Sequence, residues 1–257
     1  MGRRLLTGTV ITVAVFCALA LSAGCGMAMG LRAPAMLSSG EARDVVRRVI
    51  SLVAVLAALV LGMSIVSLKS TFDAADRDIR RLGAQIEELD RTLHRAGPPA
   101  SEARQLLLRY TSALVRGTFP ELDAPFRGDP GNVDDLQDAL EASLERLGAG
   151  LSVPSGITEA RAVLHAVIQT RWTMEENTGA SVSGWQLGVL IFWLMLIFAG
   201  LGLFAPRNAL VIGALLLCAA AVACAVFLMT EFDDPFTGVI TVSSKPLLSA
   251  LHALANR

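Results

Sequence analysis

The sequence predicts an all-α integral membrane protein with four transmembrane helices and a helical extramembrane domain inserted between the second and the third. Two hydrophobic stretches, residues 185–205 and 209–230, contain no ionisable side chain except the thiols of Cys218 and Cys224. Each has the roughly twenty apolar residues that an α-helix needs to cross ~30 Å of hydrocarbon. Hydrophobic residues make up 53% of the chain and charged residues 18%, and the charges gather in residues 69–176. This composition fits four spans plus a substantial water-soluble part.

Two further apolar segments near the N-terminus, residues 5–31 and 49–68, are also predicted to span the membrane. Basic residues flank both segments, and neither contains a charged side chain. The first has an alternative interpretation as a secretory or lipoprotein signal, because Arg3 and Arg4 precede it and a Ser-Ala-Gly-Cys string ends at Cys25. Its apolar run continues past that cysteine and is longer than a signal core, so we interpret it as a membrane helix.

The last two spans are separated only by residues 206–208, which predicts a membrane hairpin. The fourth span is rich in glycine and alanine, and the third carries bulky side chains at Phe192, Trp193 and Phe198. Small side chains let helix backbones approach closely in lipid, where packing holds helices together. We therefore expect the third and fourth spans to pack tightly against each other.

Residues 69–182 are predicted to form the helical domain, which begins with a heptad stalk. Apolar residues recur every seven positions, and a second apolar set fills the alternate position: Phe72, Ile79, Ile86 and Leu93, with Ala75, Leu82, Leu89 and Ala96. The pattern extends back into the second span, which predicts one long helix that ends at Gly97 and the two prolines after it. A heptad stripe specifies a buried seam but does not specify its partner. The stripe could pack inside a bundle of one chain; we predict that it holds subunits together.

Three more helices are predicted in this domain from apolar residues at helical spacing. The first begins at Ser101 and the third at Thr158, and we expect each of these residues to cap its helix. The second covers residues 133–147, and the third runs on to residue 176. Residues 117–132 are rich in proline, glycine and acidic residues, which is typical of a loop. No segment shows the alternation of a strand, so the domain should be wholly helical.

The cysteines and histidines give no sign of a metal site, a disulfide framework or a catalytic centre. All four cysteines lie inside proposed spans, where a thiol behaves as a small apolar group, and the three histidines are scattered. The sequence shows no spaced set of metal ligands and no nucleophile paired with a base. The formal net charge of −1 does not indicate a nucleic-acid partner. We therefore expect a protein that is not an enzyme and has no cofactor.

Strings with a recognisable pattern lie along almost the whole chain from Leu37 onward. They are found at residues 59–62, 69–73, 89–93, 97–98, 103–109, 170–172, 192–194, 202–208, 231–238 and 243–251. Together they resemble the bestrophin-like family of bacterial multi-pass membrane proteins, a family whose function is not established. The resemblance implies a protein whose partners include the lipid bilayer.

A shorter string follows the last span and consists of Asp233, Asp234, Pro235, Phe236 and Gly238. It is similar to the acidic Pro-Phe-Gly element after the fourth span of bestrophins, which are pentameric chloride channels and carry this element on the cytoplasmic side. The resemblance implies a homo-oligomer, a pentamer, that passes chloride or another anion. The alternative is structural: Pro235 and Gly238 make the turn that ends the last helix, and Phe236 anchors in its apolar rim.

Four spans place both termini and the helical domain on the same side of the membrane. Eight basic residues lie near membrane ends on that side: Arg3, Arg4, Lys69, Arg77, Arg80, Arg81, Arg171 and Lys245. Five lie on the opposite side: Arg32, Arg43, Arg47, Arg48 and Arg207. The positive-inside rule therefore predicts an inner-membrane protein whose termini, helical domain and C-terminal tail (residues 231–257) are cytoplasmic.

We expect the second span to line an ion path. Ser64, Ser67 and Thr71 lie at i, i+3 and i+7, so their hydroxyls share one helix face where a partly dehydrated anion could meet them. The alternative for these hydroxyls is hydrogen bonding to the backbone or to another helix. The spans carry no charge, which argues against a coupled transporter. The channel has one rival, a non-conducting scaffold or sensor whose helical domain binds a protein partner.

Overall fold

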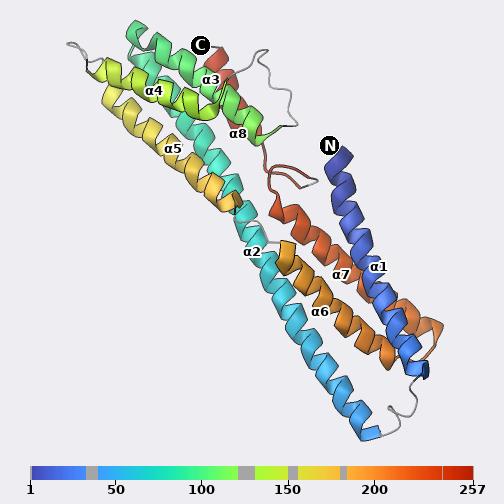
Figure 1. Cartoon of the computed structure of the whole chain (residues 1–257). Coiled ribbons are helices and arrows are strands. Elements are labelled where there is room, and N and C mark those ends of the chain that lie inside the picture. Colours follow the sequence, from blue (N-terminus) through green and yellow to red (C-terminus); the bar gives the residue numbers. More distant parts are fainter. Residues whose placement is uncertain are drawn as a thin grey trace. The chain divides into compact units, whose positions relative to one another are not determined.

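The structure is a computed structural model that describes residues 2–32, 40–120, 131–149, 156–179, 184–238 and 240–256. Every regular element in these ranges is a helix, which confirms the all-α fold class. Four of the helices are long and apolar enough to cross a membrane, as predicted. The helices are α1 (Gly2–Arg32), α2 (Gly40–Arg95), the 3₁₀ turn η1 (Pro98–Ala100), α3 (Ser101–Thr118), α4 (Val133–Gly148), α5 (Ile157–Gly179), α6 (Gly184–Leu203), α7 (Ala209–Asp233) and α8 (Lys245–Ala255) (Figure 1).

Two compact units make up the chain. The membrane unit comprises Met1–Thr71, Ala180–Asp234 and Gly238–Ile240. The helical unit comprises Phe72–Gly179, Pro235–Thr237 and Thr241–Arg257. The segment between α7 and α8 thus has residues in both units.

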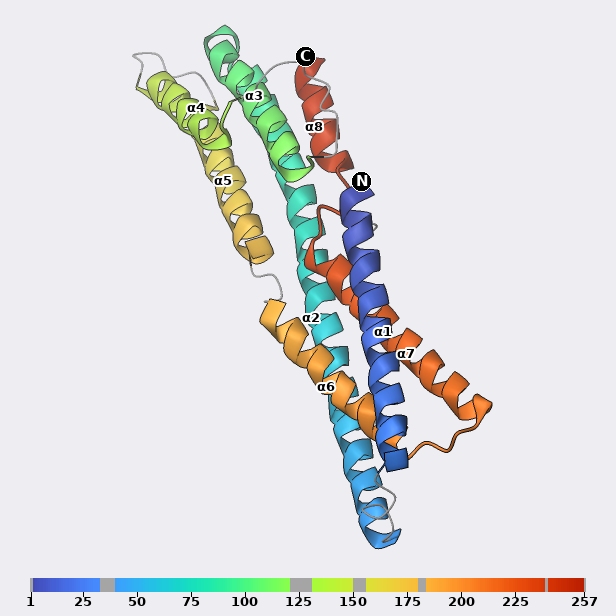
Figure 2. The same ribbon diagram turned by 45° about the vertical axis from the view of Figure 1, so that its right-hand side comes forward.

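α2 is one unbroken helix of 56 residues, in line with the continuation of the heptad pattern into the second span (Figure 2). It ends at Arg95. Gly97 then takes a positive φ of 78°, which side chains with a Cβ rarely adopt. Pro98 follows at the start of η1, and its ring lacks the N–H that a continuing helix would need.

The two predicted helix caps are wrong in position. Ser101 is the first residue of α3, because η1 leads directly into the helix and Ala100 takes the cap position. Thr158 lies inside α5, which begins one residue earlier at Ile157. At α4 the side-chain oxygen of Asn132 accepts a hydrogen bond from the backbone N–H of Asp134 at 3.2 Å, so this helix has a polar cap that we did not predict.

In the membrane unit, α1 packs against both α6 and α7 (Figures 1 and 2). Its backbone nearly touches that of α6, because a Cβ atom added to Gly202 would lie 2.1 Å from the carbonyl oxygen of Ala23. The hydroxyl of Ser22 strengthens this contact by donating to the carbonyl oxygen of Met195 at 2.6 Å. The prediction that the third and fourth spans pack tightly on each other is therefore wrong about the partner, since α1 makes the close contact with each.

The heptad stripe of α2 lies in the core of the helical unit. Its isoleucine and leucine side chains are fully buried: Ile79, Leu82, Ile86, Leu89 and Leu93. They form one hydrophobic cluster with residues of α3, α4, α5 and α8 of the same chain. The prediction that this stripe holds subunits together is wrong, because the surfaces that cover it come from the same chain.

The C-terminal tail belongs partly to this core. α8 buries Leu247, Ala250, Leu251 and Leu254. Its first turn crosses α2 so closely that a Cβ atom on Gly83 would lie 2.8 Å from the carbonyl oxygen of Pro246. No helix is predicted in residues 231–257 from the sequence. α8 has only 11 residues, and a helix this short depends on tertiary contacts for its stability.

Candidate functional site

The three hydroxyl residues predicted to meet an ion lie together beside one cavity. Ser64, Ser67 and Thr71 occupy successive turns of α2 in the membrane unit and line a cavity of about 430 Å³. The opposite wall comes from α6, and Met229 of α7 closes one side. The three residues that share one helix face by their spacing in the sequence thus also line the same cavity.

The α6 wall contains polar residues that the sequence did not single out as part of a site. Trp185, Gln186 and Trp193 line the cavity together with apolar residues. Trp185 and Trp193 stand two i, i+4 steps apart, so they lie along one side of α6, and this spacing is a signal that could have been noticed. None of the residues that line the cavity has a charged side chain. The cavity is therefore uncharged, with a few polar groups set among mostly apolar side chains.

The hydroxyls differ in their hydrogen bonds. Ser64 donates to the carbonyl oxygen of Val60 at 2.9 Å, and Thr71 donates to that of Ser67 at 3.4 Å. These are bonds to the fourth residue back in the same helix, a common arrangement for serine and threonine in helices. Within the described residues, the hydroxyl of Ser67 makes no such bond, and Ser67 is exposed. Of the three hydroxyls, that of Ser67 can donate a hydrogen bond to a bound ion without first breaking a bond to the helix backbone.

α2 is the span that the chain covers least. Only 6% of its most apolar window is buried within the chain, against 17–28% for the other three spans. Large apolar side chains such as Leu52, Leu59 and Met63 are 59–66% exposed. This surface must be covered by lipid or by other copies of the chain, because it is too apolar to face water over its full length.

The predicted turn after the last span is described residue by residue. α7 ends at Asp233, and the carbonyl oxygen of Pro235 accepts a hydrogen bond from the N–H of Val242 at 2.8 Å. The ring of Phe236 packs edge-to-face on Phe119 of the helical unit, with centroids 5.7 Å apart. Gly238 has a φ of 133°, a conformation that favours glycine. In the structure these residues turn the chain and anchor Phe236 in the helical unit.

A buried carboxylate that we did not predict lies just before this turn. Glu231 is 7% exposed, although it stands one residue after the predicted end of the fourth span. Its Oε2 accepts a hydrogen bond from the backbone N–H of Ile240 at 3.2 Å. A Cβ atom on Gly238 would lie 2.8 Å from the same oxygen, so a residue without a side chain is needed there. Glu231 thereby holds the segment after α7 against the end of the helix.

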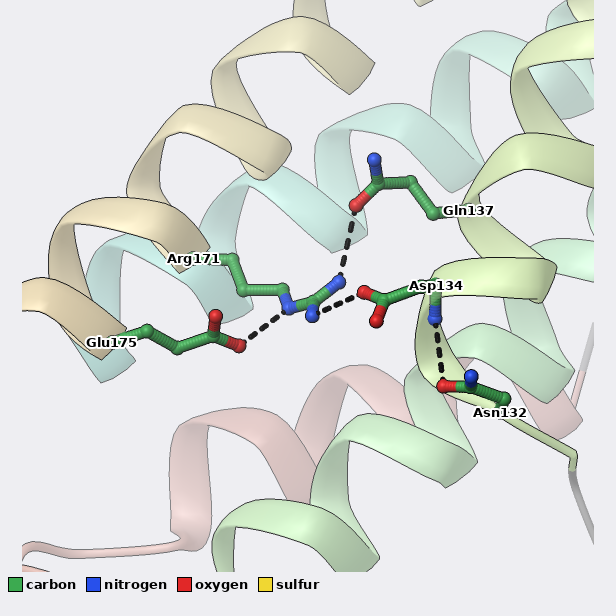
Figure 3. A network of polar contacts seen from close by, with 5 residues as sticks. All are labelled: Asn132, Asp134, Gln137, Arg171 and Glu175. Atoms are coloured by element: carbon green, nitrogen blue, oxygen red, sulfur yellow. Dashed lines mark hydrogen bonds and ion pairs between the residues drawn. The ribbon is translucent and has the colours of Figure 1, made fainter.

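A buried arginine joins α4 to α5 in the helical unit (Figure 3). Arg171, 7% exposed, donates to Asp134 at 2.6 Å, to Glu175 at 2.8 Å and to the side-chain oxygen of Gln137 at 3.1 Å. Burial lowers the pKa of Arg171, but the hydrogen bonds to Asp134 and Glu175 outweigh it and raise the pKa above its ordinary value. The guanidinium of Arg171 therefore stays charged, and its ion pair with Asp134 links α5 to α4.

The hydroxyl of Tyr110 lies in the same core. Burial raises the pKa of Tyr110 above its ordinary value, and the nearby charge of Arg171 opposes this only in part. Among the described residues its oxygen has no hydrogen-bond partner.

No group of three or more potential metal ligands comes together in the described part of the chain.

Comparison with known proteins decides the family. The Bestrophin-like domain matches residues 14–247 of the chain. The protein belongs to the Bestrophin-like family. This membership confirms the resemblance seen in the sequence, and it covers both units of the structure. No curated protein matches the sequence.

Solved structures share the fold of this bestrophin-like chain. A variant of a bacterial bestrophin homologue from Klebsiella pneumoniae matches with a TM-score of 0.71 at 13% identity, covering 95% of this chain and 98% of that one. Two structures of variants described only as a membrane protein match with TM-scores of 0.72 and 0.63, also at 13% identity, with 95% of this chain and 97% of that chain covered in each case. Identities this low show a common fold and do not by themselves carry over the role of any residue.

Proposed function

We propose that this bestrophin-like protein forms a homo-oligomeric channel that passes chloride or another small anion along α2. The observation that supports this most directly is the cavity beside α2. It gathers Ser64, Ser67 and Thr71 opposite indole and amide groups, and no charged side chain lines it. Such a lining can bind an anion weakly enough to release it, which conduction requires.

The chemistry of the cavity suits an anion that has lost part of its water shell. Ser67 has a hydroxyl free to donate, and Trp185, Trp193 and Gln186 supply N–H donors from the other wall. A hydrogen bond to a charged partner contributes roughly 1.5–3 kcal/mol net. Ser64 and Thr71 would have to rotate away from their backbone acceptors to take part. No carboxylate lines the cavity to repel an anion.

The uncovered surface of α2 supports assembly. One chain buries only 6% of this span and cannot enclose a path with it. Several copies arranged around a common axis would cover α2 surfaces with one another, and closed rings are the usual form of such assemblies. The similarity of the segment from Asp233 to Gly238 to the bestrophin element favours five copies.

We also propose that the protein lies in the inner membrane with its termini and helical unit in the cytoplasm. Basic residues near membrane ends favour this orientation by eight to five.

A non-conducting scaffold or sensor is the alternative. Trp172 of α5 is 59% exposed on the surface of the helical unit. Exposed tryptophans are enriched at the centres of protein interfaces, so this residue would be the natural anchor for a protein partner. The scaffold predicts binding through the helical unit and no ion flux.

Purified protein in liposomes separates the two functions. We expect a chloride-dependent flux, reduced several-fold by Ser67→Leu because this change removes the one uncommitted hydroxyl. The matched control is Ser51→Leu: Ser51 is also an exposed serine of α2, bonded to the carbonyl oxygen of Arg47, and it lies outside the cavity.

Three outcomes decide the proposal. A well-assembled parent protein that passes no halide at either voltage polarity and over a range of pH would favour the scaffold. Equal loss of flux in the Ser67 and Ser51 variants would show that the cavity hydroxyl has no special part in conduction. A selective loss at Ser67 with unchanged native mass supports the path proposed for α2.

A further inference from the structure

The two main walls of the cavity beside α2 come from helices that run in opposite directions within the membrane unit (Figures 1 and 2). At one end of this α2–α6 pair, a Cβ atom on Gly200 would lie 2.6 Å from the side chain of Ile50. At the other end, Leu68 and Leu187 line one small cavity next to α7. Residues of α2 and α6 therefore face each other in reverse order, and the two walls can be compared level by level.

One end of the cavity lies at the predicted border of the membrane and is polar. Thr71 is the last residue of α2 in the membrane unit, three positions after the predicted end of the second span. Across from it, α6 begins with Trp185 and Gln186, and both of these residues are exposed. Tryptophan is enriched at the level of the lipid headgroups. Together with the hydroxyl of Ser67, the indole and amide groups supply hydrogen-bond donors at this level.

The other end and the floor of the cavity are mostly apolar. Val60, Val189 and Trp193 line the deep end, and the indole N–H of Trp193 is the one polar group that these side chains carry. Leu190 and Met229 form the floor and are 6% and 4% exposed. These surfaces offer close packing rather than hydrogen bonds, which suits methylene groups.

The length of the cavity matches one leaflet of a bilayer. From Thr71 to Val60, α2 rises about 16 Å at 1.5 Å per residue. Half of the ~30 Å hydrocarbon core is about 15 Å. The cavity is also open at its side, because Trp185 and Val189 are 67% and 54% exposed although they line it. A lipid chain of the adjoining leaflet can therefore enter without crossing the protein.

We propose that this cavity holds one acyl chain of a bilayer phospholipid, from the leaflet on the side where α2 continues into the helical unit. The ester carbonyl oxygens accept hydrogen bonds from Ser67, Trp185 and Gln186 at the polar end. The chain runs from there along the floor to Val60. No charged side chain lines the cavity, so the headgroup stays outside it in water.

A lipid chain in the cavity competes with an anion. Ser64 and Ser67 line the cavity between its two ends, so methylene groups that cover them keep an anion away. The hydroxyl of Ser64 already donates to the carbonyl oxygen of Val60 and needs no partner from the lipid. Departure of the chain would then open the proposed path. This consequence rests on the proposed function, whereas the lipid site itself does not.

Photolabelling of the full-length protein in liposomes tests the lipid site. The probe is a trace of phosphatidylcholine with a diazirine at the end of one acyl chain, and mass spectrometry locates the label. Leu190 and Leu194 are a matched pair on α6, because both are 6% exposed but Leu190 lines the cavity and Leu194 does not. Lipid outside the protein reaches both residues to the same small extent. We expect several-fold more label at Leu190, because a chain inside the cavity lies against it.

A larger side chain at the deep end gives a second test. V60W places an indole in the cavity and should lower the label at Leu190 several-fold. The matched control V66W adds the same ring to α2 at a side chain that is 70% exposed and does not line the cavity, so the label should not change. Light scattering and circular dichroism in detergent check native mass and helix content. If V60W loses helix content, V189W replaces it under the same criteria.

Each outcome has one meaning. Equal label at Leu190 and Leu194 in the parent protein overturns the inference and indicates that protein, such as another copy of the chain, covers the cavity. Unchanged label in a well-folded V60W, or equal loss in V66W, overturns it as well. If a small mole fraction of free palmitate removes the label from Leu190, the occupant is a free fatty acid and the inference is wrong.

Chloride flux through the same liposomes keeps the two proposals apart. Label at Leu190 without flux overturns the channel and leaves the lipid site standing. Flux without preferential label at Leu190 overturns the lipid site and leaves the channel standing.

Discussion

Changing Ile86 to alanine tests whether the heptad stripe of α2 is core or a seam between subunits. The side chain is fully buried within the helical unit. Alanine removes three buried carbon groups, and at ~0.8 kcal/mol for each the loss of transfer free energy is about 2.4 kcal/mol. The cavity left behind adds to this loss, so the helical unit should be destabilised by roughly 2–5 kcal/mol.

Hydrogen exchange of backbone amides in the full-length protein measures this loss. Exchange through opening of a unit follows its free energy of opening, and ~1.4 kcal/mol corresponds to a factor of ten. Amides of α3 and α5 should therefore exchange at least about 30-fold faster in Ile86→Ala, while those of α6 should not change. The control is Glu88→Ala, an exposed position on the same helix, which should leave every rate unchanged.

One result would refute the reasoning about Ile86. If the alanine variant lowers the native mass of the assembled protein but leaves exchange in the helical unit unchanged, the stripe holds subunits together. The heptad position of Ile86 would then indicate its role better than its burial within one chain does.

Three other predictions concern Tyr110, Gly202 and the orientation of the chain in the membrane. Tyr110 is the only tyrosine of the chain, and burial raises its pKa above the ordinary value of 10.0. The helical unit should therefore lose stability as the pH rises above that value, and Tyr110→Phe should remove this loss in urea unfolding at several pH values. Gly202→Val should lower the melting temperature in detergent because its side chain would collide with the backbone of α1, whereas Gly213→Val, with open space around it, should not. A reporter fused after α8 should give the cytoplasmic signal, and a periplasmic signal would reverse the proposed orientation.

The sequence was sufficient for features that depend on neighbouring residues alone. Long apolar runs without charge predict membrane helices because lipid leaves backbone groups no partner outside the helix. The start of α4 at Val133 and the end of α2 before Gly97 could also be predicted, since the spacing of apolar residues and the effects of glycine and proline act over a few residues. The grouping of Ser64, Ser67 and Thr71 on one side of α2 also follows from helical spacing.

Tertiary structure decided which surfaces meet. Hydropathy shows that a stripe is buried but not by what, so the partner of Ile86 and the packing of α1 on both α6 and α7 could not be read from local pattern. Glu231 became a buried carboxylate only because the segment at Ile240 folds back to donate to it. The α6 wall of the cavity, with Trp185 and Trp193, likewise comes from residues more than a hundred positions after Thr71, the last of the three hydroxyl residues. Such contacts depend on the shapes of distant segments packed together, and no short window of sequence contains both partners.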